Sequence, residues 1–195
     1  TVLVEGDNIT LDGQGGASGF TGIASNADSG SSGDGGLVSV TANGNLKILD
    51  GSEISSNTFG AGDAGKVVVE AEDILIDRDG SIAFTGIASE AAATSLGDGG
   101  IVSVTANNSL TLEEGGQIAS NTYGVGDAGY VVVDTVDMSI DGQGSGYFTG
   151  LASTAEIGSS GNAGAVVVTA SGDITVQDGG GIASDTWENG DAGTV

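Results

Sequence analysis

One acidic position recurs in a Gly-rich motif that reads GDAG, GDGG or, once, GNAG. Its occupants are Asp34, Asp63, Asp98, Asp127, Asn162 and Asp191. Carboxylates stacked about 5 Å apart would repel one another, and a hard cation with oxygen ligands, such as Ca²⁺, would relieve that repulsion. Alternatively, each Asp accepts backbone N–H groups in an Asx-turn. The turn is favoured, because the calcium-binding nonapeptide GGxGxD does not occur at its required spacing.

Aromatic side chains are sparse and recur at fixed positions. One series is Phe59, Tyr123 and Trp187, and the other is Phe20, Phe84 and Phe148. If successive turns of the chain, here called coils, stack on one another, the members of each series would stand two coils, or about 10 Å, apart. Such a spacing suits a track for stacking carbohydrate. Packing beneath a corner loop is the favoured interpretation, with Tyr123 and Trp187 the better candidates for exposure.

A third recurring position, next to the Ile of an Ile-Ala-Ser element, always holds a small residue. These residues are Ala24, Ser55, Ala88, Ala119, Ala152 and Ala183. We expect a flat, nearly uncharged face there, which would allow lateral contact with another fibre or with a flat ligand. The alternative is that the longer Gly/Ser-rich loop of alternate coils, such as 26–36, folds over this face.

Catalytic chemistry is not expected. Lyases need a base such as Arg or Lys near acidic residues, and glycoside hydrolysis needs two carboxylates across one bond. The acidic residues here recur with the repeat, His is absent, and neither Lys47 nor Arg78 belongs to a convergent cluster. We therefore predict that the chain is no enzyme and holds no cofactor beyond the calcium considered above.

The positions described so far belong to an internal repeat. A shift of 64 residues aligns the segments that start at Leu37, Ile101 and Ala165 without a gap. The chain therefore divides into three two-coil repeats, 1–65, 66–129 and 130–193, which form one segment over 1–195. The ends share the repeat's phase and show no atypical capping coil, so we expect a fragment of a longer array.

Within each coil, apolar residues alternate with polar ones, and Gly, Asn and Asp clusters separate short runs. This pattern predicts three short strands per coil, with one face buried. One coil is too small to fold alone, so its neighbours in the chain must be its partners. The expected fold is all-β, a right-handed parallel β-helix of six coils. Its inward columns are Val4, Val40, Val69, Val104, Val133 and Val168; Leu11, Ile48, Ile76, Leu112, Ile140 and Val176; and Ile23, Ile54, Ile87, Ile118, Leu151 and Ile182.

Charge restricts the partners. The chain has 27 acidic residues against 3 basic ones and a formal net charge of −24. Nucleic acids and anionic membranes would be repelled, and no apolar run is long enough to insert into a bilayer. Cys is absent, which excludes disulfides and thiolate metal sites. Any export signal is expected to lie outside this segment.

The motifs GDAGKVVVE, GDAGYVVVD, SLTLEE and QIASNTYG resemble the repetitive shaft of filamentous haemagglutinin-like adhesins, exoproteins of two-partner secretion systems. The resemblance covers the whole chain. It implies a β-helical fibre at the surface of, or secreted by, a Gram-negative bacterium, with roles in adhesion, aggregation or biofilm. A structural shaft is the favoured function, with glycan or host surface as its target and lateral self-association into fibres. A carbohydrate-binding or polysaccharide-processing β-helix is the alternative.

Overall fold

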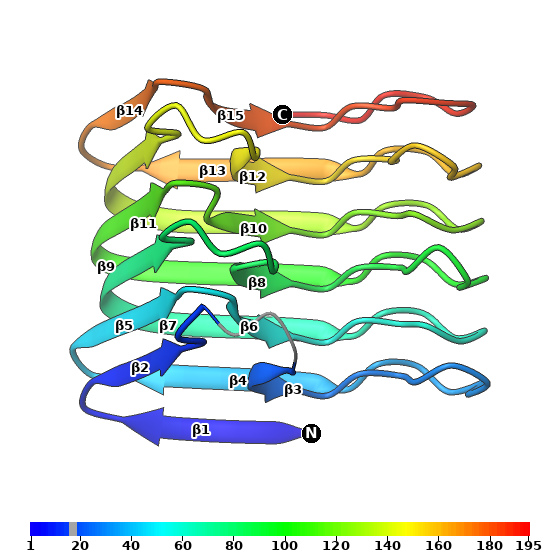
Figure 1. The fold of residues 1–195 in the computed structure, drawn as a ribbon, viewed down its shortest axis with the longest axis horizontal. Helices are drawn as coiled ribbons and strands as arrows, with labels where there is room; N and C mark the ends of the chain where they lie inside the picture. Colours follow the sequence, from blue (N-terminus) through cyan, green and yellow to red (C-terminus); the bar gives the residue numbers. More distant parts are fainter. Residues whose placement is uncertain (16–18) are drawn as a thin grey trace.

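The computed structural model describes residues 1–15 and 19–195, and all regular elements in these residues are β-strands (Figure 1). The strands form a nine-stranded and a six-stranded sheet. The nine-stranded sheet contains β1 (Val2–Gly6), β2 (Ile9–Asp12), β4 (Leu37–Ala42), β5 (Asn45–Leu49), β7 (Lys66–Asp77), β9 (Ile101–Glu113), β11 (Tyr130–Asp141), β13 (Ala165–Ala170) and β14 (Ile174–Gln177). The six-stranded sheet contains β3 (Thr21–Ala24), β6 (Ser52–Ser55), β8 (Gly86–Ala88), β10 (Gln117–Ala119), β12 (Thr149–Ala152) and β15 (Gly180–Ala183).

All strand pairs are parallel, and each strand pairs with its equivalents in the preceding and following coils. The coils therefore rise one above another from the blue N-terminus to the red C-terminus (Figure 1). This arrangement confirms the predicted right-handed parallel β-helix. Within the described residues, no helix is long and apolar enough to cross a bilayer.

The corner between the first two strands of a coil differs from the prediction. Three separate strands occur in coils 1, 2 and 6, whereas β7, β9 and β11 each run through this corner as one bent strand. Gly44 and Gly172 stand at the corner in coils 2 and 6, and Gly6 ends β1 just before it in coil 1, whereas the continuous coils carry no Gly there. Gly weakens a strand because it has no side chain to pack. A register shift at the bend of β9 accommodates one extra residue.

The core is the set of aliphatic columns between the two sheets. The three predicted columns are confirmed by the strand registers, which pair each member with its equivalent in the next coil. In the middle coils these side chains are at most 1% exposed. Burial of each one contributes roughly 1.5–3 kcal/mol, so the stack of coils supplies the stabilisation that one coil lacks.

Each coil also extends into an arm that projects away from both sheets (Figure 1). A Ser and a Gly close the base of every arm, as in the pair Ser120 and Gly129. The Gly N–H donates to the Ser carbonyl of its own coil at 2.8–3.0 Å. The Ser Oγ donates to the Gly carbonyl of the preceding coil at 2.6–2.8 Å. These hydrogen-bonded pairs, here called Ser–Gly clasps, hold the base of each arm closed and connect it to the preceding coil.

Replacing a clasp glycine should damage the stack. A Cβ on Gly129 would overlap with the carbonyl oxygen of Gly100 and with Oγ of Ser120. We expect Gly129→Ala to lower the free energy of unfolding by about 3 kcal/mol, measured by urea denaturation followed by circular dichroism. The matched control is Gly33→Ala, where an added Cβ meets nothing within 4 Å; its effect should stay within about 0.5 kcal/mol. Equal midpoints for the two variants would refute the proposed role of the clasp.

Candidate binding groove

The recurring acidic position lies in the arms, two residues before the clasp Gly, and its side chains form a ladder between coils. Asp34 Oδ1 accepts the backbone N–H of Asp63 at 3.0 Å, and the pattern continues through Asp98, Asp127 and Asn162 to Asp191 at 2.7–2.9 Å. The side chains accept backbone N–H groups, as the turn hypothesis expected, but the donors belong to the next coil. Within the described residues no group of three or more acidic, His or Cys side chains is arranged to hold a metal. Calcium binding there stays a prediction.

The small residues of the six-stranded sheet do not form an open surface. Ser55, Ala88, Ala119 and Ala152 are at most 5% exposed, and Ala24 and Ala183 in the terminal coils are half-buried. The expectation of an open flat face is therefore wrong for coils 2 to 5. The alternative, that the longer loop folds over this face, also differs from the structure, because the arms project away (Figure 1). Lateral contact between fibres stays a prediction.

Two of the small residues, Ala152 and Ala183, instead lie on the floor of a groove that has one wall at the base of the arms. There, Thr58, Thr122 and Thr186 form isolated parallel bridges with Ala residues of the neighbouring coils. The residue after each Thr is aromatic, which places Phe59, Tyr123 and Trp187 in one column two coils, or about 10 Å, apart. Asp28 precedes Phe59 in this column, and Ala92 and Glu156 lie between the aromatic residues.

These aromatic rings are accessible. Trp187 is 63% exposed, and Phe59 and Tyr123 are 38% and 36% exposed, so the expected exposure of Tyr123 and Trp187 is confirmed and extends to Phe59. In the second series, Phe148 is 38% and Phe20 57% exposed, so packing beneath a loop is wrong for these two, whereas Phe84 is half-buried. Aromatic side chains on both sides of a floor of small residues make a groove with apolar walls.

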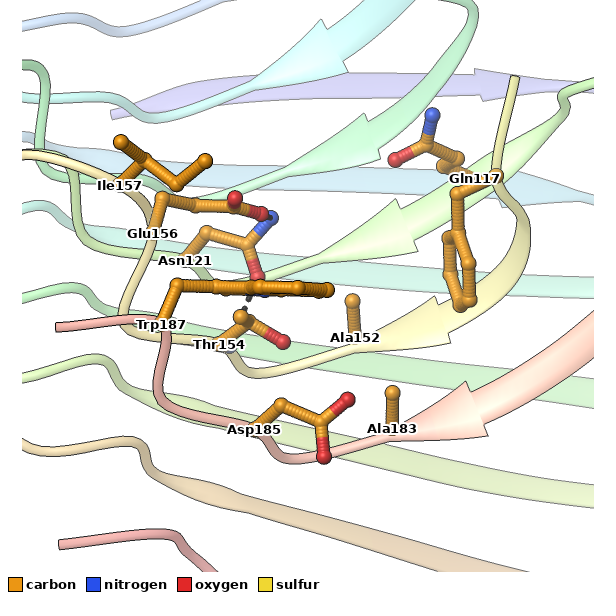
Figure 2. A pocket seen from close by; sticks show the side chains of 10 residues that line it. Gln117, Asn121, Ala152, Thr154, Glu156, Ile157, Ala183, Asp185 and Trp187 are labelled. Carbon is orange, nitrogen blue, oxygen red and sulfur yellow. Dashed lines mark hydrogen bonds between the residues drawn. The ribbon is translucent and has the colours of Figure 1, made fainter. Parts of the chain in front are cut away.

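The groove contains two hollows. The first, here called the Glu90 slot, has a volume of about 160 Å³ and is lined by Asn57, Phe59, Glu90, Ala92, Ala93 and Tyr123. The second, the Trp187 cavity, has a volume of about 280 Å³. Its lining residues include Gln117, Phe148, Ala152, Glu156, Asp185 and Trp187. Figure 2 shows the Trp187 ring extending toward Ala152, with Glu156 and Asn121 on one side and Thr154 and Asp185 on the other.

Glu90 is the most perturbed acid of the groove. Burial, followed by the negative charges of Glu53 and Glu156, raises the pKa of Glu90 to about 8. Its Oε1 is shielded from solvent and has no hydrogen-bond partner. A neutral Glu90 at neutral pH is the consequence, since an unpaired carboxylate in this position would be costly.

Burial also shifts the pKa values of the neighbouring titratable groups. Burial raises the pKa of Glu156, with a further contribution from Asp185, and burial also raises the pKa of Glu53. Burial, followed by the charges of Glu90 and Glu156, raises the pKa of Tyr123 above its usual value. The groove is thus negative and partly shielded from water.

Sequence reasoning missed Glu90, although a signal was present. Its equivalents in coils 1, 2 and 4 are Asn26, Asn57 and Asn121, whose Oδ1 atoms accept the backbone N–H of the next coil at 2.8 Å. Glu90 thus breaks a column of Asn. Thr154 and Asp185 are the other members that depart from Asn, and Glu90 is the buried acidic one.

Glu90 should give stability an identifiable pH dependence. Because the folded pKa lies above the ordinary value of 4.5, the native state binds an extra proton between these two values, and stability falls as the pH rises through that window. Glu90→Gln removes this loss. We expect the melting temperature of Glu90→Gln, relative to the unchanged chain, to rise from about pH 5 to about pH 9 in calorimetry.

The control for this experiment is Glu70→Gln, which removes the same charge from an exposed position. Its melting temperature relative to the unchanged chain should vary little over the same range. If both variants give the same curve, Glu90 does not titrate as a buried group.

Comparisons with family models, with curated proteins and with solved structures found no match to this chain. The resemblance to haemagglutinin-like shafts therefore stays a prediction. What is established for the chain is a repetitive β-solenoid with an acidic, aromatic-walled groove.

Proposed function

We propose that this chain is part of the shaft of a secreted or cell-surface bacterial fibre that mediates adhesion, aggregation or filament formation. The observation that carries the proposal is the continuity of the aliphatic columns from coil to coil. The columns through Val40, Ile48 and Ile54 continue in every coil, and the Ser–Gly clasps repeat with them. In such a solenoid each coil contacts only the coils next to it, and the molecule lengthens as coils are added. Both properties suit a rod.

The surface charge is consistent with this role. A net charge of −24 keeps rods soluble and disfavours contact with nucleic acid and with anionic membranes. The proposal assigns no catalytic activity to the shaft, because the acidic groups that recur with the coils serve the coil structure, as the ladder through Asp63 and Asp98 illustrates. Adhesion would use the exposed side chains of the repeated coils.

A second candidate function is carbohydrate binding in the groove. It is favoured by one observation, the exposed column of Phe59, Tyr123 and Trp187 beside two hollows. Ligand pockets are lined mainly by apolar and aromatic groups with a few polar side chains, and both hollows have this composition. A glycan array probed with the chain tests this candidate, and an array without any hit contradicts it.

The shaft proposal predicts how length depends on coil number. Insertion of four further copies of residues 66–129 after residue 129 adds eight coils, which should lengthen the particle by about 38 Å at about 4.8 Å per coil. Small-angle X-ray scattering measures this increase. The control is an insertion of equal length made of Gly and Ser, which should give a flexible chain instead of a longer rod of constant thickness.

Electron microscopy of the full-length protein that contains this segment tests the shaft itself. We expect a thin rod with a uniform diameter over this region. A compact, globular particle would contradict the proposal.

A further inference from the structure

The Glu90 slot has the size of a single ring. Its volume of about 160 Å³ is close to that of an engineered protein cavity of roughly 150 Å³ that holds benzene. Phe59 and Tyr123 lie on either side, and Ala92, between them in the column, leaves the space open. A ligand with a compact ring and apolar faces fits these walls.

The slot also lacks a positive partner. Glu90 lines it with a carboxyl group whose Oε1 has no hydrogen-bond partner, and Glu53 and Glu156 add negative charge nearby. None of the basic residues of the chain lines either hollow. Lys47 and Lys66 belong to the nine-stranded sheet. Arg78 donates to the carbonyls of Ser81 and Ile82 and stacks on Tyr147 at 3.4 Å. A cation for this slot must come from the ligand.

The same combination recurs one repeat along the groove. In the Trp187 cavity, Glu156 and Asp185 are the acidic groups, Trp187 is the exposed ring, and Gln117 and Asn121 supply amides. The aromatic members of the column stand two coils, or about 10 Å, apart along the solenoid axis. A two-sugar unit of an extended polysaccharide has a similar length, so one linear chain would reach both hollows. Two linked contacts bind far more tightly than either alone.

We propose that the groove binds a linear polysaccharide of amino sugars that carry free ammonium groups, with one sugar ring in the Glu90 slot. The inference rests on the second candidate function, carbohydrate binding, and adds the class of sugar. Glu90, neutral in the free groove, releases its proton to solvent when the ligand binds, and its carboxylate then accepts a hydrogen bond from the ammonium group. The aromatic rings pack against the apolar faces of the sugars and attract the positive charge. Glu53, Glu156 and Tyr123 are the other titratable groups that act on Glu90. Their negative charges favour the bound ammonium.

The test is isothermal titration of the whole chain with a glucosamine hexamer. The comparison ligands are the N-acetylated hexamer, which has the same rings without positive charge, and hexalysine, which has the charge without the rings. The variants are Glu90→Gln and Trp187→Ala. Their matched controls are Glu70→Gln and Tyr130→Ala, which alter an exposed acid and an aromatic residue that is 57% exposed on the nine-stranded sheet.

We expect the glucosamine hexamer to bind the unchanged chain, and each groove variant to lose at least about tenfold in affinity, roughly 1.4 kcal/mol. The two control variants should bind as the unchanged chain does. The N-acetylated hexamer and hexalysine should bind at least about tenfold more weakly. Circular dichroism melting of each variant verifies that the coils remain folded.

Three results would overturn the inference. Equal binding of the N-acetylated hexamer, with loss in Trp187→Ala, would keep carbohydrate binding and remove the role of the ammonium group. Equal binding of hexalysine, with the same loss in Glu90→Gln and Glu70→Gln, would indicate general attraction to an acidic surface. Absence of binding by every ligand would reject the groove as a binding site. The shaft proposal would be unaffected, because the measurement of particle length tests it separately.

Discussion

The fixed spacing between parallel strands is the constraint on which the whole structure depends. Every residue lies about 4.8 Å above its equivalent in the preceding coil, so a side chain that fits once must fit again at each level. Aliphatic residues such as Val69 and Ile87 meet this condition by stacking. Polar residues such as Ser89 and Asp63 meet it through hydrogen bonds between coils. The repetition in the sequence is the direct consequence.

The same constraint explains which features were predictable. The columns through Val40, Ile48 and Ile54 followed from period-two patterning and from the 64-residue shift, because burial leaves a clear mark on residue type. The continuous strands β7, β9 and β11 were not predicted, since the bend of an extended chain depends on whether Gly interrupts it. The sequence also did not reveal that each Asp accepts its hydrogen bond from the next coil. Asp is the favoured residue both in an Asx-turn within one coil and in a ladder between coils.

The groove was harder to anticipate than the fold. Its floor of small residues was recognised, but residue size alone does not reveal whether neighbouring side chains enclose a surface, and Ala119 is fully buried. Its walls come from two separate places in the coil, the arm base with Tyr123 and the segment before the six-stranded sheet with Phe148. In the Trp187 cavity, only the stacking of successive coils brings Phe148 and the arm-base residue Trp187 to the same hollow. The perturbed acid Glu90 depends on that enclosure as well.

The ladders of the arms also have a direction. The side-chain oxygens of Asn26 and Asp34 accept backbone N–H groups from residues that come later in the chain, Asn57 and Asp63. A coil that has already formed therefore presents its successor with a row of acceptors held in place. Each finished turn thus offers a template to the turn beside it, and the stack can grow through contacts between neighbouring coils alone.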